Sequence, residues 1–159
     1  MRILPKISLR KASFSDIEFL WYLRNQHYVY KNSRIHKPVD WKDHINWIMP
    51  ILLGFKKKDF FIIECSNKKA GQIRFDYKNK EAEVSISLLE EFCGRGIGSR
   101  ALKLAIARIE KKAERVMAEV KKDNTASIKL FKKLDFKRKS QKGEWFQYVL
   151  KICKEKNEK

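Results

Sequence analysis

The chain has 159 residues, 43% of them hydrophobic, which is enough for one domain with its own buried core. No apolar run approaches the length of a membrane span, and residues 1–6 lack the apolar stretch of a signal peptide. With 37 basic and 19 acidic residues, the net charge is +18. These values argue against membrane-spanning and secreted classes of protein.

The positive charge has three interpretations. Basic residues are spread along the whole chain, with short runs such as 56–58 and 137–139. A solvated, lysine-rich surface ranks first, and a positive field that attracts anionic small molecules ranks second. Nucleic-acid binding ranks third, because the chain has no reader motif and does not interleave its basic residues with exposed aromatic ones. We therefore expect neither a nucleic-acid nor a membrane partner.

The cysteines and histidines show no disulfide or metal-binding pattern. The three cysteines, Cys65, Cys93 and Cys153, are an odd number without metal-ligand spacing. The three histidines, at positions 27, 36 and 44, do not cluster with other ligand types. We therefore expect no bound metal and a reducing, cytoplasmic location.

The N-terminal third predicts one strand and two helices. Residues 7–10 are typical of a strand, and residues 16–25 place apolar side chains at helical spacing. Asp40 is the predicted N-cap of a second amphipathic helix over 40–49. Pro50 either closes this helix or kinks it near its end.

The rest of the chain predicts strands first and then an alternation of helices and strands. Three strands follow one another without helices between them, over 59–65, 70–77 and 82–89. Later elements are a helix, a strand, a helix and a hairpin, over 98–112, 115–121, 124–134, and 136–139 with 145–151. We expect one domain over 1–153 and a charged, frayed tail over 154–159.

Three glycines, Gly94, Gly96 and Gly98, alternate between the third of these strands and the helix that follows it. Glycine permits unusual dihedrals and close approach of a ligand, and a helix N-terminus offers unpaired N–H groups and a favourable dipole. The segment therefore predicts a phosphate site, and a diphosphate more than a single phosphate. It lacks the Lys-Ser/Thr of a Walker A loop and does not open a βαβ unit as a Rossmann fingerprint would.

Two motifs in this order resemble the GNAT superfamily of acyl-CoA-dependent N-acyltransferases. The glycine loop is similar to the family's Arg/Gln-x-x-Gly-x-Gly/Ala, and residues 124–127 with 134–136 are similar to its Asn-x-x-Ala/Ser helix and closing turn. The resemblance implies an α/β (α+β) fold, with a mixed, mostly antiparallel sheet of about seven strands splayed between the fourth and fifth, and four helices. It also implies acetyl-CoA as co-substrate and no metal.

The resemblance further implies which residues bind the donor. The pantetheine arm would extend the ladder of the fourth strand, and the loop and the later helix would hold the rest: Ser87, Leu88, Cys93, Gly94, Arg95, Gly96, Gly98, Ser99, Asn124, Ser127 and Phe131. Cys93 stands where the family usually has Arg or Gln, so we expect weakened but not abolished CoA binding. Phe131 stands where many members have the tyrosine that reprotonates the CoA thiolate. Tyr148, a water or the substrate ammonium would then serve as acid.

Glu83, Ser85 and Ser87 alternate with apolar residues and so share one face of their strand. Three polar groups on a central strand indicate a cleft or a water chain. Since the family often places a general base here, Glu83 is the predicted base, acting through water, with Ser85 beside it. The alternative is a strand-end carboxylate paired with a lysine. No activated nucleophile is visible, so we expect direct attack by the amine.

The acceptor residues are implied by a narrower resemblance. The Trp-x-x-Arg-Asn and His-x-x-Trp patterns and the segment 71–76 resemble the branch that N-acetylates nucleotide-linked amino sugars, including the enzyme of the pseudaminic-acid pathway. This implies Arg24, Asn25, His44, Trp47 and Arg74 as acceptor residues, with the two arginines on a diphosphate or carboxylate. Core packing for the tryptophan and helix capping for Arg24 are the alternatives.

Two other functions stay open. One is a protein or peptide N-terminal acetyltransferase of the ribosomal-protein type, and the other is a non-catalytic CoA-binding or RNA-binding module. Polyamine and aminoglycoside acceptors are not expected, because a strongly basic protein repels polycations. The protein is expected to be a monomer or a homodimer.

Overall fold

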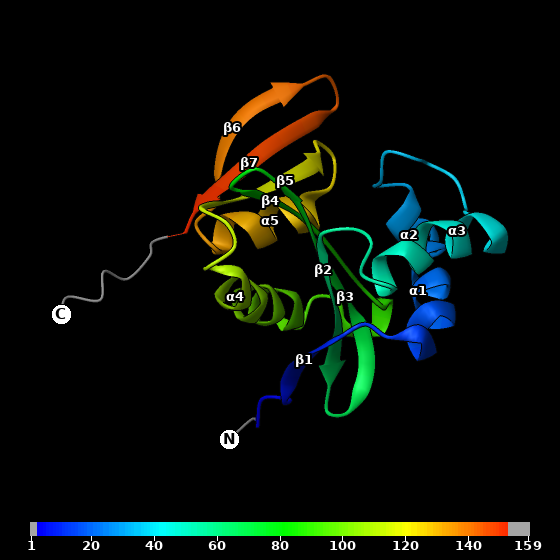
Figure 1. Cartoon of the computed structure of the whole chain (residues 1–159). Coiled ribbons are helices and arrows are strands. Elements are labelled where there is room, and N and C mark those ends of the chain that lie inside the picture. The colour runs from blue at the N-terminus through cyan, green and yellow to red at the C-terminus, as the bar shows by residue number, and fades with distance from the viewer. Residues whose placement is uncertain (1–2, 153–159) are drawn as a thin grey trace.

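The computed structural model describes residues 3–152, in which seven strands form one sheet with the order β1-β2-β3-β4-β5-β7-β6 (Figure 1). Neighbouring strands are antiparallel, except that β4 and β5 are parallel. The predicted mixed sheet is therefore confirmed, whereas the expected tail over 154–159 lies outside the described residues. The strands are β1 (Ile7–Lys11), β2 (Lys58–Cys65), β3 (Lys68–Lys78), β4 (Glu81–Leu88), β5 (Arg115–Lys121), β6 (Lys137–Lys142) and β7 (Trp145–Lys151).

The four predicted helices are confirmed, and α2 is an additional single turn that the sequence pattern missed. The predicted N-cap at Asp40 forms, since its side chain accepts the N–H of Asp43 at 2.8 Å. Asn124 caps α5 in the same way and accepts the N–H of Ser127 at 3.2 Å. Pro50 lies inside the last turn of α3 and does not end it. The helices are α1 (Ile17–Arg24), α2 (His27–Tyr30), α3 (Trp41–Leu52), α4 (Ile97–Ile109) and α5 (Thr125–Lys133).

The two faces of the sheet carry different cores, because strand side chains alternate between the faces. On one face α4 and α5 cover a large apolar cluster that includes the fully buried Phe75 and Val116. On the other face α1 and α3 cover a smaller cluster, and Figure 1 shows these helices gathered with α2 beside β2 and β3. The smaller cluster consists of Leu20, Ile48, Ile51, Phe60 and Ile62.

The pairing of β4 with β5 is short, and this positions the site. Only three register pairs join the two strands within the described residues, and the last of them is Glu83 with Met117. Beyond this point β4 continues to Leu88 beside β3 alone. We call the widening between β5 and residues 84–88 of β4 the splay.

Gly71 holds the outer half of β4 close to β3. A Cβ at this glycine would lie 2.2 Å from the carbonyl oxygen of Ser87, so no side chain fits there. Glycine permits this close approach of two backbones. The outer half of β4 is therefore held by β3 on one edge and open to the splay on the other.

Candidate active site

The glycine loop joins the end of β4 to the first turn of α4. Gly94 and Gly96 have left-handed φ values of 69° and 73°, a region that favours glycine. A Cβ at either position would meet no atom beyond its chain neighbours within 4 Å, so the space above the loop is open. The first N–H groups of α4 have no intrahelical partner, and its first turn carries no acidic side chain. The loop therefore has the geometry of an anion site.

Two basic side chains at this loop were missed in the sequence. Lys133, in the last turn of α5, places its Nζ 3.4 Å from Ser99 Oγ. Arg100, in the first turns of α4, has a buried Nη1 without a hydrogen-bond partner in the described part of the chain. The predicted Arg95 is exposed, and its Nη1 donates to the carbonyl of Glu91 at 3.3 Å. The packing of α5 on α4, which brings Lys133 here, has no signal in the linear sequence.

Cys93 does not resemble an activated nucleophile. Protein atoms around its thiol and the nearby Glu90 carboxylate raise the pKa of Cys93, although part of the residue is exposed. Its Sγ lies 3.5 Å from the carbonyl oxygen of Leu89. A raised thiol pKa leaves little thiolate at neutral pH, which is consistent with direct attack by an amine.

In the outer half of β4, the main-chain N–H and C=O groups of every second residue point toward the splay. The carbonyl of Ser87 faces β3, where it lies against Gly71. The N–H of Leu89 donates to Ala70 of β3 at 2.8 Å, and this peptide bond is trans, so the carbonyl of Leu88 points to the opposite edge. Of the two predicted ladder residues, Leu88 therefore faces the splay with its main chain, and Ser87 does not.

A polar face lies beside the splay, on the same side of the sheet as α1 and α3. The predicted Glu83, Ser85 and Ser87 of β4 stand opposite three polar residues of β3, and we call the six the acceptor face: Gln72, Arg74, Asp76, Glu83, Ser85 and Ser87. Gln72 donates through Nε2 to Ser87 Oγ at 3.0 Å. Gln72 is 8% exposed, and its Oε1 is buried without a hydrogen-bond partner among the described residues. Sequence reasoning missed Gln72, although it alternates with Arg74.

Glu83 has the electrostatics of a base. The surrounding protein raises the pKa of Glu83, and Glu119 and Asp76 raise it further, while Arg74 and Arg34 act in the opposite direction. No lysine pairs with Glu83 in the described part of the structure. The alternative of a strand-end carboxylate in an ion pair is therefore not seen, and a raised pKa suits a group that accepts a proton near neutral pH.

Three of the predicted acceptor residues come together. Arg24, at the end of α1, donates through Nη2 to the carbonyl of Ile35 at 3.2 Å, and its Nη1 is buried with no partner in residues 3–152. Burial lowers the pKa of Arg24, and the nearby Arg74 lowers it further. Arg74 pairs with Asp76 at 3.0 Å and lies 5.0 Å from the centre of the Trp47 ring. Two guanidinium groups and an indole thus border the acceptor face.

Two other predicted acceptor residues have their polar atoms occupied by the fold. Asn25 donates to the carbonyl of Val39 at 2.9 Å and accepts its N–H at 2.8 Å. His44 is 2% exposed, and its Nε2 lies 2.9 Å from the carbonyl oxygen of Ile17. Burial lowers the pKa of His44, so the neutral ring donates this bond. Both residues position α3 and its preceding loop on α1.

The loop between α2 and α3 reaches across to β5 and β7, which the sequence did not predict. Arg34 pairs with Glu119 of β5 at 2.7 Å. The Arg34 guanidinium lies 4.3 Å from the centre of the Trp145 ring, and His36 stacks on the same ring at 6.5 Å. These contacts place the loop opposite the acceptor face, near Glu83.

The remaining predicted residues lie on the α5 side of the sheet. Tyr148 is 1% exposed and stacks on Phe131 with ring centres 6.4 Å apart. Its side chain and that of Glu83 therefore point to opposite faces, and the structure does not bring the two together. Asn124 and Ser127 form the N-cap of α5. Tyr148 does contact Phe131, the position at which many GNAT members have their acid.

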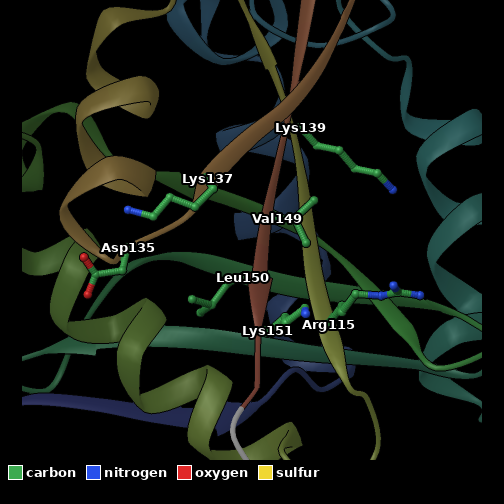
Figure 2. Close-up of a pocket in the computed structure, with 7 residues that line it drawn as sticks. All are labelled: Arg115, Asp135, Lys137, Lys139, Val149, Leu150 and Lys151. Atoms are coloured by element: carbon green, nitrogen blue, oxygen red, sulfur yellow. The ribbon is translucent and has the colours of Figure 1, made fainter.

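A groove of about 550 Å³ lies away from the splay, at the start of β5 and along β6 and β7. Figure 2 shows that its basic side chains diverge, because Lys137 extends toward Asp135 while Lys139 and Arg115 extend the other way. Arg115 is also paired with Glu81 at 2.9 Å. These cations share no common target, so we assign no ligand to the groove lined by Arg115, Asp135, Lys137, Lys139, Val149, Leu150 and Lys151.

The described part of the chain has neither a metal-binding cluster nor a membrane-spanning helix. Residues 3–152 contain no group of three or more His, Cys, Asp or Glu side chains that could hold a metal ion. None of the helices described is both long and apolar enough to cross a membrane.

Two archaeal sequences are similar to this chain over most of its length. The uncharacterised protein MJ1062 of Methanocaldococcus jannaschii is 30% identical over 156 residues, which cover 91% of this chain and 31% of that protein. The uncharacterised N-acetyltransferase MJ1207 of the same organism is 26% identical over 148 residues, or 87% of this chain and 62% of that protein. The chain thus spans less than two thirds of either relative.

Solved structures share the fold. A domain from M. jannaschii superimposes with a TM-score of 0.84 at 25% identity, covering 93% of this chain and 99% of that one. The ribosomal-protein alpha-N-acetyltransferase RimL in complex with coenzyme A gives 0.78 at 22% identity (92% and 94% covered). The Vibrio cholerae spermidine N-acetyltransferase with CoA and spermine gives 0.80 at 15% (92% and 95%), and the Campylobacter jejuni N-acetyltransferase PseH gives 0.70 at 17% (92% and 99%).

The family is shown by a match to a family model that covers well over half of the chain. Residues 6–137 match the family model described as "Acetyltransferase (GNAT) domain". That range includes β4, the splay, the glycine loop and all of α4 and α5. The chain belongs to the GNAT acetyltransferase family.

Proposed function

We propose that the chain is an acetyl-CoA-dependent N-acetyltransferase in which an amine attacks the thioester directly, with residues 1–153 as one catalytic domain. The observation that carries the proposal is the path of β4, which parts from β5 after Glu83 and ends in the open glycine loop. One strand thereby offers main-chain groups to an extended arm and leads straight to an anion site. Acetyl-CoA has that shape, with a pantetheine arm that ends in a pyrophosphate.

On the donor side, we assign the pyrophosphate to the N–H groups of the 93–99 loop and the first turn of α4. Lys133 and Arg100 add positive charge there, and Arg100 has a free buried Nη1 for an anionic oxygen. The main chain of Leu88, and by alternation that of Ile86, faces the arm in the splay. The N-cap of α5 at Asn124 borders the same region.

For the chemical step, we assign Glu83 as the base that takes the amine proton through a water beside Ser85. The amine nitrogen then bonds to the acetyl carbon, the carbon–sulfur bond breaks, and the electron pair leaves with sulfur. The nitrogen, positively charged once it is bonded to the acetyl carbon, loses its second proton to the CoA thiolate, directly or through water, which leaves a neutral amide and the CoA thiol. Tyr148, the predicted acid, contacts Phe131, which stands at the position of the missing tyrosine.

For the acceptor, we propose an amine that also carries an anionic group, namely a nucleotide-linked amino sugar. The support is the buried, unpartnered Nη1 of Arg24, which is free to bind a diphosphate or carboxylate oxygen. The nearby guanidinium of Arg74 adds positive charge there, although it also pairs with Asp76. Trp47 lies under Arg74 and offers an aromatic surface. Asn25 and His44 act indirectly, by holding α3 and its preceding loop in place.

The test is release of the CoA thiol from acetyl-CoA with a panel of acceptors in matched pairs. Each UDP-amino sugar is compared with the same free amino sugar, and each N-terminal peptide with spermidine as the polycation. We expect turnover on the nucleotide-linked amine and at least about tenfold less on the free sugar, which lacks the anion. Turnover on peptides alone would move the function to protein acetylation. Absence of turnover and of CoA binding would overturn the enzymatic proposal.

A further inference from the structure

Tyr28 is the side chain that fills the open edge of β4. It lies in the middle of α2, and its hydroxyl donates to the carbonyl oxygen of Leu88 at 2.9 Å, across 60 positions of the chain. This is the carbonyl that points away from β3, because the N–H of the same trans peptide is bonded to Ala70. The Tyr28 hydroxyl therefore stands in the splay, where β5 no longer pairs with β4.

The surroundings of Tyr28 belong to the donor side of the site. Its electrostatic neighbours are Cys93 and Glu90, which open the glycine loop. Burial, together with Cys93 and the Glu90 carboxylate, raises the pKa of Tyr28 to about 12, and a hydrogen bond from the Glu90 main chain partly opposes this rise. The hydroxyl thus keeps its proton at neutral pH and remains a donor to Leu88.

The position of Tyr28 also links the two halves of the site. Arg24, which borders the acceptor face, lies only four residues earlier in the chain. The intervening Asn25 anchors the α1 end to Val39 by two hydrogen bonds. Tyr28 is thereby held between the acceptor residues and the strand that receives the donor.

We propose that Tyr28 is a donor-binding residue of this acetyltransferase: its hydroxyl, fixed on the Leu88 carbonyl in the splay, contacts the pantetheine arm of acetyl-CoA. The inference rests on the proposed function, since it needs acetyl-CoA in the splay. A tyrosine hydroxyl has two acceptor lone pairs, so beside the hydrogen bond from the Glu90 main chain one remains for an amide N–H of the arm. The arm would then meet Tyr28 and the β4 main chain together, just inside the glycine loop.

The experiment compares Tyr28→Phe with the wild type and with Tyr30→Phe as a matched control. Tyr30 lies on the same helix, and its ring contacts His27 instead of reaching β4. Dissociation constants for acetyl-CoA come from calorimetry, and KM and kcat come from thiol release. Both are repeated with S-acetylpantetheine, which lacks the pyrophosphate and the nucleotide. All measurements are made well below the melting temperature of each variant.

We expect Tyr28→Phe to raise the dissociation constant and the KM for acetyl-CoA about three- to tenfold, the range for one hydrogen bond, with kcat nearly unchanged. The same factor should appear with S-acetylpantetheine, and Tyr30→Phe should behave as the wild type. A lower melting temperature with unchanged affinity would mean a purely structural role, and tighter binding would mean that Tyr28 blocks the arm. Either result overturns the proposal while leaving the enzyme assignment intact. Failure of the wild type to bind CoA would instead defeat the proposed function.

Discussion

The two ends of α1 each hold a charged side chain in a buried setting, and they are satisfied differently. At the start, Asp16 has no exposed side-chain surface and bonds to Arg10 at 2.7 and 2.8 Å and to Lys69 at 2.8 Å. At the other end, Arg24 has a buried Nη1 without a partner among residues 3–152 and a second guanidinium, that of Arg74, close by. The charge of the first is paired within the chain, whereas the second keeps one guanidinium nitrogen without a hydrogen-bond partner in the described part of the chain.

The contrast extends along the acceptor face. The side chains of His44 and Asn25 form hydrogen bonds with main-chain carbonyl groups of α1 and the 31–39 loop. Gln72 keeps a buried Oε1 without a partner, and Glu83 has no ion pair with any described side chain. Buried polar groups are almost always satisfied in folded proteins, so the unpartnered Gln72 Oε1 points to a missing ligand or ordered water. Glu83 is exposed, so its carboxylate is open to water or substrate. Substitutions of the paired groups should therefore affect stability, and those of the unpaired groups should affect activity.

The largest expected effect is that of Glu83→Gln. Loss of the base should lower kcat about 100- to 1,000-fold while the KM for acetyl-CoA stays unchanged. Glu81→Gln is the control, since Glu81 lies on the same strand face and is paired with Arg115. Because the pKa of Glu83 is raised, the wild-type rate should fall as pH drops through a value above that of an ordinary glutamate, about 4.3. Steady-state rates over a range of pH test this, and an unchanged profile in Glu83→Gln would remove Glu83 as the base.

The second-largest expected effect is a loss of stability in Asp16→Asn. Hydrogen bonds from Arg10 and Lys69 outweigh the effect of burial and hold the pKa of Asp16 well below its usual range. Removing the charge should cost about 2 to 3 kcal/mol, less than for a fully buried pair because Arg10 and Lys69 are partly exposed. Denaturant unfolding measures it, with the exposed Glu18→Gln as control.

The stability difference between the wild type and Asp16→Asn should also depend on pH. Since the folded-state pKa of Asp16 is depressed, its stabilisation is present above the unfolded-state pKa, about 3.9, and is lost as pH falls further. The stability difference between wild type and Asp16→Asn should therefore be full at pH 6 and shrink below about pH 4. A difference that is constant over this range would contradict the assignment. Acceptor KM should be unaffected in Asp16→Asn.

The smallest expected effect is that of Arg24→Met. This variant should change acceptor binding without a loss of stability, whereas Asp16→Asn should lower stability without a change in acceptor binding. Loss of one charged hydrogen-bonding group should raise the KM for an anionic acceptor about tenfold, with the KM for acetyl-CoA unchanged. Stability should stay the same or rise, because removing a buried guanidinium with an unpartnered Nη1 offsets the loss of its hydrogen bond to Ile35. Thiol-release kinetics and thermal unfolding check the two parts. A clear loss of stability without a change in acceptor KM would assign Arg24 to the architecture.

Most helices and strands could be predicted from local patterns and the donor loop from its glycines, while the arrangement of the sheet followed from the resemblance to the GNAT superfamily. The strand alternation around Glu83 and the helical spacing in α3 and α4 are local properties, and so are the caps at Asp40 and Asn124. The left-handed dihedrals at Gly94 and Gly96 follow from the residue type. These features need no knowledge of distant contacts.

The partners of the polar side chains could not be predicted in the same way. The contact of Tyr28 with Leu88 spans 60 residues and that of Arg34 with Glu119 spans 85, so no local pattern records them. α2 has four residues, too few for a helical period to appear. The motif letters that suggested His44 and Asn25 as acceptor residues also do not tell whether a side chain faces a ligand or a neighbouring carbonyl.

The central claim is that the 93–99 loop binds the pyrophosphate of acetyl-CoA, and calorimetry on Gly96→Glu tests it most directly. We expect the wild type to bind acetyl-CoA and the variant to bind at least about 100-fold more weakly, because the carboxylate fills the open space and repels the phosphates. Gly96→Ala is the control, since it carries the same backbone cost at φ 73° with no charge. Near-normal affinity in Gly96→Glu would contradict the account.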